Sequence, residues 1–150
     1  MGIFFESNTA IQNKLDDYEE GSWTPTYCQD TTETGSYTAR EGFYMKVGSL
    51  VYCKGMITLS NRGSGSGTPG IGGLPFTIRD DLTNTGQEGF GMLTYWSNTN
   101  QTSNFIFWVQ NGNTIARLQK IHGSNTVSNA SNGDFSNNSD LRFSVFYCAD

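Results

Sequence analysis

The side chains best suited to ligand-binding chemistry lie in the second half of the chain, where aromatic residues adjoin short amide-rich stretches. Tyr95 and Trp96 lead into Ser97–Gln101, and the aromatic stretch 105–108 follows. Aromatic faces can cover the C–H surface of a pyranose ring, and amides offer paired donors and acceptors to its hydroxyl groups. These residue types predict a carbohydrate-binding surface, and the candidate ligand-binding residues are Tyr95, Trp96, Asn98, Asn100, Trp108, His122 and Asn125.

The same aromatic residues could instead be buried. Side chains alternate between the two faces of a strand, so a strand over 104–110 would place Phe105, Phe107 and Val109 on one face and Ile106, Trp108 and Gln110 on the other. Because both sets are largely apolar, burial on two sides is favoured, with one side against a partner subunit. Burial is also commoner than ligand contact at strand positions. Both interpretations of Trp96 and Trp108 stay open.

Catalytic chemistry has little support in the sequence. His122 is the single histidine, so any Ser-His-Asp arrangement would have to use it, and no Gly-x-Ser-x-Gly turn is present. His122 is expected at a strand end or in a loop, either structural or hydrogen-bonded to a sugar hydroxyl. Asp80, Asp81, Asp134 and Asp140 are carboxylates of the kind that a glycosidase uses in pairs, but nothing in their spacing brings two together. We predict no enzyme and no catalytic residue, with a polysaccharide hydrolase as the least favoured alternative.

Cofactor and metal sites are not expected either. The acidic cluster Asp16, Asp17, Glu19 and Glu20 lacks the spaced aspartates and central glycine of a calcium loop. The stretch Ser60–Gly73 is rich in glycine but lacks the Gly-Lys-Ser/Thr ending of a phosphate-binding loop. Its simpler role is a flexible hairpin tip, or an edge where neighbouring subunits approach closely.

Charge, hydropathy and cysteine content indicate which classes of partner and which redox compartment to expect. The net charge is -5 and the sequence has no Lys/Arg cluster, so a nucleic-acid backbone would be repelled. No apolar run approaches the ~20 residues that span a bilayer, so we expect no membrane insertion and no export signal. Cys28, Cys53 and Cys148 are an odd number without metal-ligand spacing. They are expected to be free thiols of a chain made in a reducing cytosol.

Composition favours strands over helices. The chain has 150 residues, enough for one domain with its own core. Only 15% of its residues are charged, and Gly, Ser, Thr and Asn fill the polar positions, which favours turns and strands. We predict an all-β fold, an antiparallel jelly-roll-like β-sandwich of about eight strands. The expected strands are Thr24–Cys28, Phe43–Val47, Leu50–Leu59, Phe76–Ile78, Gly89–Trp96, Asn104–Gln110, Thr114–Ile121 and Leu141–Cys148.

Two features of the expected strands and loops concern packing and ligand contact. In Leu50–Leu59 one face carries Val51, Cys53, Ile57 and Leu59, and Gly55 within the run indicates a bulge or close packing. Three stretches are expected to be loops: Ser60–Gly73, Ser97–Ser103 and His122–Asp140. The last is long for a compact domain, so it is either a ligand-facing excursion or a mobile tip.

Three motifs in the first half of the chain are similar to those of a known protein family. They are LDDYEEGSWTPT at Leu15–Thr26, YMKVGSLV at Tyr44–Val51 and GLPF at Gly73–Phe76. In type and order they resemble the C-terminal head domain of bacteriophage tail fibres. The opening Gly2–Phe5 resembles the end of the fibre stalk that precedes such heads. The resemblance covers roughly the first half of the chain and fades after Phe76.

The resemblance implies a homotrimeric β-sandwich head in the virion, made in the host cytoplasm and acting at the host cell surface. Residues 1–22 would be the connector from the stalk and 23–150 the head. The head would bind a bacterial surface glycan or an outer-membrane protein, and the unmatched half would carry receptor specificity. The alternative is a structural domain that caps the trimer without touching a receptor. In either case we expect the acidic residues near Leu15–Thr26 to be solvated, and Trp23 to plug one end of the sandwich.

Overall fold

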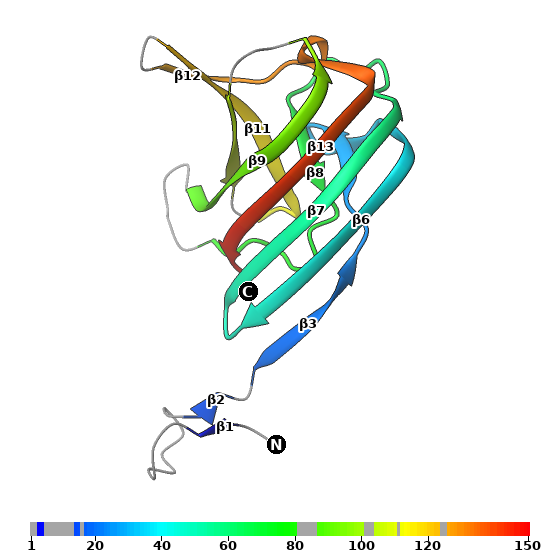
Figure 1. Ribbon diagram of the computed structural model, residues 1–150. Coiled ribbons are helices and arrows are strands. Elements are labelled where there is room, and N and C mark those ends of the chain that lie inside the picture. Colours follow the sequence, from blue (N-terminus) through cyan, green and yellow to red (C-terminus); the bar gives the residue numbers. More distant parts are fainter. Residues whose placement is uncertain are drawn as a thin grey trace.

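The structure, a computed structural model, describes residues 3–4, 14–15, 17–80, 87–100, 104–110, 112–123 and 126–150. Within these ranges β1 (Ile3–Phe4) pairs with β2 (Lys14–Leu15). The other strands form one antiparallel sheet (Figure 1). They are β3 (Tyr18–Trp23), β4 (Thr26–Gln29), β5 (Thr32–Glu33), β6 (Ser36–Val47), β7 (Leu50–Asn61), β8 (Pro69–Gly72), β9 (Gln87–Thr99), β10 (Asn104–Gln110), β11 (Ile115–His122), β12 (Thr126–Asn129) and β13 (Phe135–Cys148).

This sheet curls so that its two halves face each other. Its strand order is β3-β6-β7-β13-β9-β10-β11-β8-β4-β5, with β12 paired to β11. Tyr27 of β4 lies far from Phe135 of β13 in that order, yet their rings meet edge to face at 5.7 Å. In Figure 1 the strands β6, β7, β13 and β9 form one layer and β11 and β8 lie behind it. The core fills the space between the layers.

The all-β antiparallel class is therefore confirmed, with differences in detail. The described sheet has eleven strands where about eight were expected. A jelly roll has two separate sheets, whereas here one continuous ladder forms both layers. Residues 76–78 are not a strand, because Ile78 makes a single isolated bridge to Ala149. No described stretch forms a helix long and apolar enough to cross a membrane.

Alternation along the central strands is confirmed. In β7 the side chains of Val51, Cys53, Ile57 and Leu59 are all buried. In β10, whose bounds are as expected, Phe105, Phe107 and Val109 are buried while Ile106, Trp108 and Gln110 are half-buried on the opposite, outer face of the sheet.

All three expected loops contain regular structure. Within Ser60–Gly73, residues 60–61 end β7 and Pro69–Gly72 form β8, so this stretch is not one continuous loop. Residues 122–140 include β12, the 3₁₀ helix η2 (Asn132–Asp134) and the first residues of β13. Residues 97–99 belong to β9, and 101–103 lie outside the described residues. The expectation of a long loop here was wrong, because the described part of this polar stretch pairs with β11 and β9. Its contact with a ligand stays a prediction.

The segment expected as the end of the connector is an edge strand. β3 pairs with β6 along its whole length, from Tyr18 opposite Val47 to Trp23 opposite Gly42. The Asp17 carboxylate accepts a hydrogen bond from Lys46 Nζ at 2.5 Å. The division into a connector over 1–22 and a head over 23–150 stays a prediction, and β3 crosses that boundary.

The cysteines are unpaired, as expected. Cys28 and Cys53 are buried, whereas Cys148 is half-buried. Burial raises the pKa of the Cys53 thiol to about 12. Since the thiolate is the reactive form, Cys53 is a core residue and an inert one.

The glycine-rich stretch lies against this chain's own β4–β5 hairpin. Alternate glycines face the hairpin: a Cβ on Gly63 would meet the Thr34 backbone carbonyl, and a Cβ on Gly65 would lie 2.5 Å from Gln29 Oε1. The Asp30 amide also donates to Thr68 O at 2.9 Å. The close approach that these glycines permit is thus within one chain.

We expect Gly63→Ala to lower the free energy of unfolding by about 1–3 kcal/mol. The added methyl group would meet backbone, which cannot turn aside, and Gly63 has a φ of 76° that disfavours other residues. Ser64→Ala, at the exposed neighbouring position, is the matched control and should change stability by less than about 0.5 kcal/mol. Urea unfolding measures both, and equal losses would contradict the packing described.

Candidate functional site

The predicted ligand-binding residues do not converge on one pocket. Tyr95 and Trp96 point to opposite faces of the sheet, as neighbours in a strand do. The β9–β13 register shifts between Leu93 and Tyr95, where Phe143 pairs with Leu93 but Arg142 pairs with Tyr95, and this places Trp96 on the same inner face as Leu93. Tyr95 is on the outer face, 46% exposed. Trp96 packs inward, edge to face with Phe105 at 5.9 Å. Trp96 is therefore largely a packing residue.

Asn98 and Asn100 hold the chain where β9 ends. Asn98 adopts a left-handed backbone conformation with φ 54°, and its Nδ2 donates to Asn138 O at 3.1 Å. Asn100 Nδ2 donates to Gly133 O at 2.9 Å. Both amides join β9 to the segment that precedes or opens β13.

The remaining candidates lie elsewhere. Trp108 lies on the outer face of β10, with the Arg117 guanidinium 6.0 Å from its ring centre. His122 Nε2 and Ser128 Oγ are hydrogen-bonded at 2.7 Å across the β11–β12 pair. Asn125 lies outside the described residues. As a ligand-binding set these residues stay a prediction, but the structure does not assemble them.

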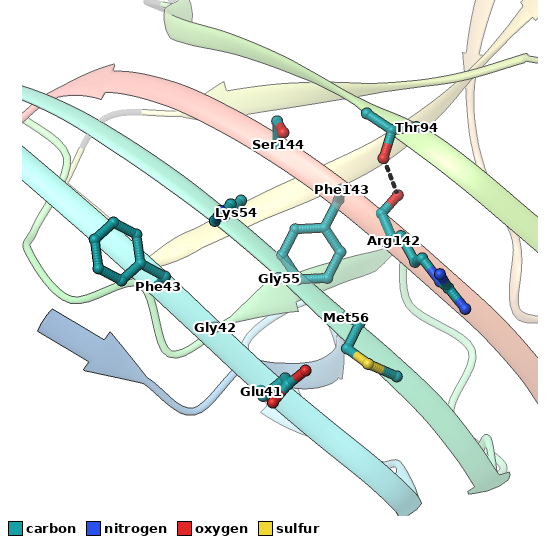
Figure 2. A pocket seen from close by; sticks show the side chains of 10 residues that line it. All are labelled: Glu41, Gly42, Phe43, Lys54, Gly55, Met56, Thr94, Arg142, Phe143 and Ser144. Carbon is teal, nitrogen blue, oxygen red and sulfur yellow. Dashed lines mark hydrogen bonds between the residues drawn. The ribbon is translucent and has the colours of Figure 1, made fainter.

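A shallow pocket that the sequence did not indicate lies on the outer face beside Tyr95. Figure 2 shows it across β6, β7, β13 and β9. Its volume is about 440 Å³. Its lining residues are Glu41, Gly42, Phe43, Lys54, Gly55, Met56, Thr94, Arg142, Phe143 and Ser144. We call it the outer-face pocket.

Strand register places these side chains in two rows. Glu41, Met56, Arg142 and Tyr95 are successive cross-strand neighbours, and the next outward row is Phe43, Lys54, Ser144 and Met92. Cross-strand neighbours on one face lie about 5 Å apart. The rows therefore present aromatic, charged and hydroxyl groups side by side across four strands of the outer face.

A glycine pair forms the bottom of the pocket. Gly42 and Gly55 are cross-strand partners whose missing side chains would point inward. A Cβ on Gly55 would lie 2.8 Å from the Phe143 ring, and one on Gly42 would overlap the Trp23 indole. The backbone here rests directly on two core rings, which is the close packing expected at Gly55. In Figure 2 the Phe143 ring lies beneath Gly55.

The two cations of the pocket lie against aromatic rings, and Arg142 Nη2 also pairs with Asp140 Oδ2 at 3.3 Å. Lys54 Nζ lies 5.6 Å from the centre of the Phe43 ring, and the Arg142 guanidinium lies 4.9 Å from that of Tyr95. Thr94 Oγ1 donates to Arg142 O at 3.2 Å (Figure 2). Such cation–ring contacts limit side-chain freedom at modest energetic cost. The cations are therefore partly preorganised for a ligand.

The described side chains of the pocket offer hydrogen-bonding and stacking groups. Among its described lining residues Glu41 is the single carboxylate, whereas glycoside hydrolysis uses a pair. No group of three His, Cys, Asp or Glu within the described ranges is placed to hold a metal ion. A guanidinium, an ammonium and a carboxylate beside exposed rings can instead hydrogen-bond sugar hydroxyls and cover a sugar face.

Next to the pocket the outer face becomes apolar. Phe90 and Phe146 stack at 5.1 Å, and Tyr52 meets Phe146 at 4.6 Å. Phe90 is 65% exposed and Met92 51%. Exposed contiguous apolar surface marks an interaction site in most proteins. We call Tyr52, Phe90, Met92 and Phe146 the apolar row.

Sequence reasoning missed most of the residues that line the outer-face pocket. Alternation in Leu50–Leu59, with Val51, Cys53, Ile57 and Leu59 on one face, leaves Lys54 and Met56 on the other. Glu41 and Arg142 gave no local signal, because their neighbourhood depends on β13 lying between β7 and β9.

The chain matches no family model and no curated protein. Among solved structures, it is similar to the crystal structure of the Dettilon tailspike protein, with a TM-score of 0.72 and 15% sequence identity. The match covers 93% of this chain but 26% of that chain. At this identity the likeness shows the fold, and the all-β architecture is thus one that a tailspike protein also contains.

Proposed function

We propose that the chain is a head domain of a bacteriophage tail fibre that binds a glycan on the host cell surface through the outer-face pocket. The observation that carries the glycan assignment is the pocket itself, which Arg142, Lys54 and Glu41 line and where the Arg142 guanidinium lies against the exposed ring of Tyr95. The three sequence motifs and the likeness to a tailspike fold support the virion location.

In the proposed complex, some pocket residues cover the apolar face of a sugar and others hydrogen-bond its hydroxyl groups. Tyr95 and Met56 offer apolar surface to the C–H face of the ring, while Arg142 and Lys54 donate to hydroxyl oxygens and Glu41 accepts from hydroxyl groups. A shallow site of this kind gives weak single contacts. A homotrimer, and several fibres on one virion, would raise the effective affinity through avidity. An outer-membrane protein is the alternative receptor.

Arg142→Ala is expected to weaken glycan binding by at least about tenfold, since a charge-assisted hydrogen bond contributes roughly 1.5–3 kcal/mol. The measurement is binding of the 150-residue chain to a panel of bacterial surface polysaccharides. Arg40→Ala is the matched control, because Arg40 contacts Tyr37 and Glu33 away from the pocket. Equal binding by wild type and Arg142→Ala, or binding by none of them, would refute the site.

A second candidate function is favoured by the apolar row: the domain caps and registers the fibre trimer. Phe90 and Met92 would then be buried between subunits. Phe90→Asp should in that case convert a species with the mass of three chains into monomers, measured by sedimentation, while the wild type binds no glycan. For the third candidate, a polysaccharide hydrolase, incubation of the chain with host glycan should release new reducing ends.

A further inference from the structure

A second, polar pocket lies at the end of the sheet opposite both termini. β7 ends there, β9 ends there and β13 begins there (Figure 1). The volume of the pocket is about 230 Å³. It is lined by Arg62, Asn100, Phe135, Ser136 and Asn137, and we call it the distal pocket.

The Arg62 side chain is fixed by backbone carbonyls. Its Nη1 donates to Asn132 O and to Phe135 O, both at 2.5 Å. Its backbone amide donates to Asn137 Oδ1 at 3.2 Å. In the described residues these contacts use Nη1 of the guanidinium, and the group carries further donors on Nη2 and Nε. These hydrogen bonds hold the guanidinium at the pocket, so its side chain loses little entropy when a ligand binds.

The charge of Arg62 is not balanced within the described part of the chain. The nearby carboxylate of Asp134 is paired with Lys120 Nζ at 2.9 Å, and no described carboxylate forms an ion pair with Arg62. The neighbouring polar side chains are neutral: Asn100, Ser136 and Asn137. A fixed guanidinium beside neutral amides and a hydroxyl is suited to one anionic group with hydroxyl neighbours.

We propose that the distal pocket binds the anionic group of an acidic sugar, a carboxylate or a phosphate ester, with Arg62 as the anion partner. Asn100, Ser136 and Asn137 contact the adjoining hydroxyl groups. The overall charge of -5 disfavours a long polyanion, so the ligand carries isolated charges, as acidic residues in a polysaccharide do. This site is separate from the outer-face pocket and does not depend on it.

The test is an NMR titration of the ¹⁵N-labelled 150-residue chain with glucuronate, glucose 6-phosphate and glucose. We expect at least one of the two anions to shift the Arg62 Nε–H and the Asn100 and Asn137 side-chain amide signals saturably, and glucose to leave them in place. A response to one anion alone identifies the source of the charge. Shifts from glucose equal to those from the anions, or no shift at all, would overturn the proposal.

Asn137→Asp is the informative variant. It keeps the Oδ1 atom that accepts from the Arg62 amide but adds a negative charge at the pocket, so anion affinity should fall at least about tenfold. Asn129→Asp is the matched control: Asn129 is exposed on β12, and its Oδ1 accepts from Gln119 Nε2. Equal losses in both variants would show general charge repulsion and overturn the site.

The two proposed sites fail separately. The Tyr95 and Lys54 signals report on the outer-face pocket, and the Arg62 signals report on the distal pocket. Anion shifts at Arg62 without any glycan response at Tyr95 would leave this proposal standing and remove the proposed function.

Discussion

Trp23→Ala is expected to lower the free energy of unfolding by about 3–5 kcal/mol, the usual cost of removing a buried tryptophan. The indole is 8% exposed and lies edge to face with Phe143 at 6.1 Å. Its Nε1 donates to Phe43 O and Lys54 O, both at 3.3 Å. It thus joins the edge strand β3 to β6, β7 and β13. Truncation would leave a cavity under the glycine pair at Gly42 and Gly55, and equilibrium unfolding in urea measures its cost.

Two further variants make this measurement specific. Trp23→Phe keeps most of the packing but removes the donor, so the loss should be intermediate. Trp108→Ala removes an indole that is half-buried on the outer face, and its cost should be clearly smaller. A loss for Trp23→Ala no greater than that for Trp108→Ala would contradict the placement of Trp23.

Asp134→Asn is expected to cost a similar amount, about 3–5 kcal/mol, because it breaks a buried ion pair and leaves one charge without a partner. Asp134 is buried, its Oδ2 lies 2.9 Å from Lys120 Nζ, and the same oxygen accepts from the Ser131 amide at 2.8 Å. The carboxylate therefore fixes η2, the turn that leads into β13. Thermal unfolding at neutral pH would show the loss.

The control is an ion pair in a more exposed setting. Arg142 Nη2 and Asp140 Oδ2 lie 3.3 Å apart at a position where the arginine is exposed, so Asp140→Asn should cost at most about 1 kcal/mol. Combining Lys120→Met with Asp134→Asn should recover part of the lost stability, since no uncompensated charge then remains. Equal effects of Asp134→Asn and Asp140→Asn would contradict the account.

The strands most accessible from sequence are those with one uniformly apolar face. In β10 the buried set Phe105, Phe107 and Val109 fixes both the strand and its orientation, since a shift of one residue would expose all three. The same holds for β7. Trp23 was expected to pack at one end of the sandwich. It is buried, but beneath Gly42, near the middle of β6.

The polar region before residue 141 could not be predicted in this way. Strand propensity depends strongly on context, and the start of β13 is rich in Ser and Asn. It is a strand because Phe135 is buried and pairs with Thr99, while Asp140 pairs with Ser97 and Thr58. These partners are distant in sequence and nothing local indicates them.

The sequence predicted which types of residue would form the candidate site, but not where on the fold it lies. Tyr95 was selected as an aromatic residue next to an amide-rich stretch, and it is exposed beside the outer-face pocket. Trp96 was selected with it, but the register shift opposite Arg142 and Phe143 turns it inward. Glu41 and Arg142 line one pocket only because the last strand inserts between β7 and β9. Composition can suggest a sugar-binding surface, but strand order decides which side chains form it.

The most direct test of the central claim is hydroxyl-radical footprinting of the chain with and without the polysaccharide that it binds. Oxidation of Met56 and Tyr95, which lie in and beside the outer-face pocket, should slow severalfold on binding. Oxidation of Tyr18, an exposed residue on β3, should not change. Protection of Tyr18, or oxidation of Met56 and Tyr95 at the same rate with and without ligand, would contradict glycan binding at the outer-face pocket.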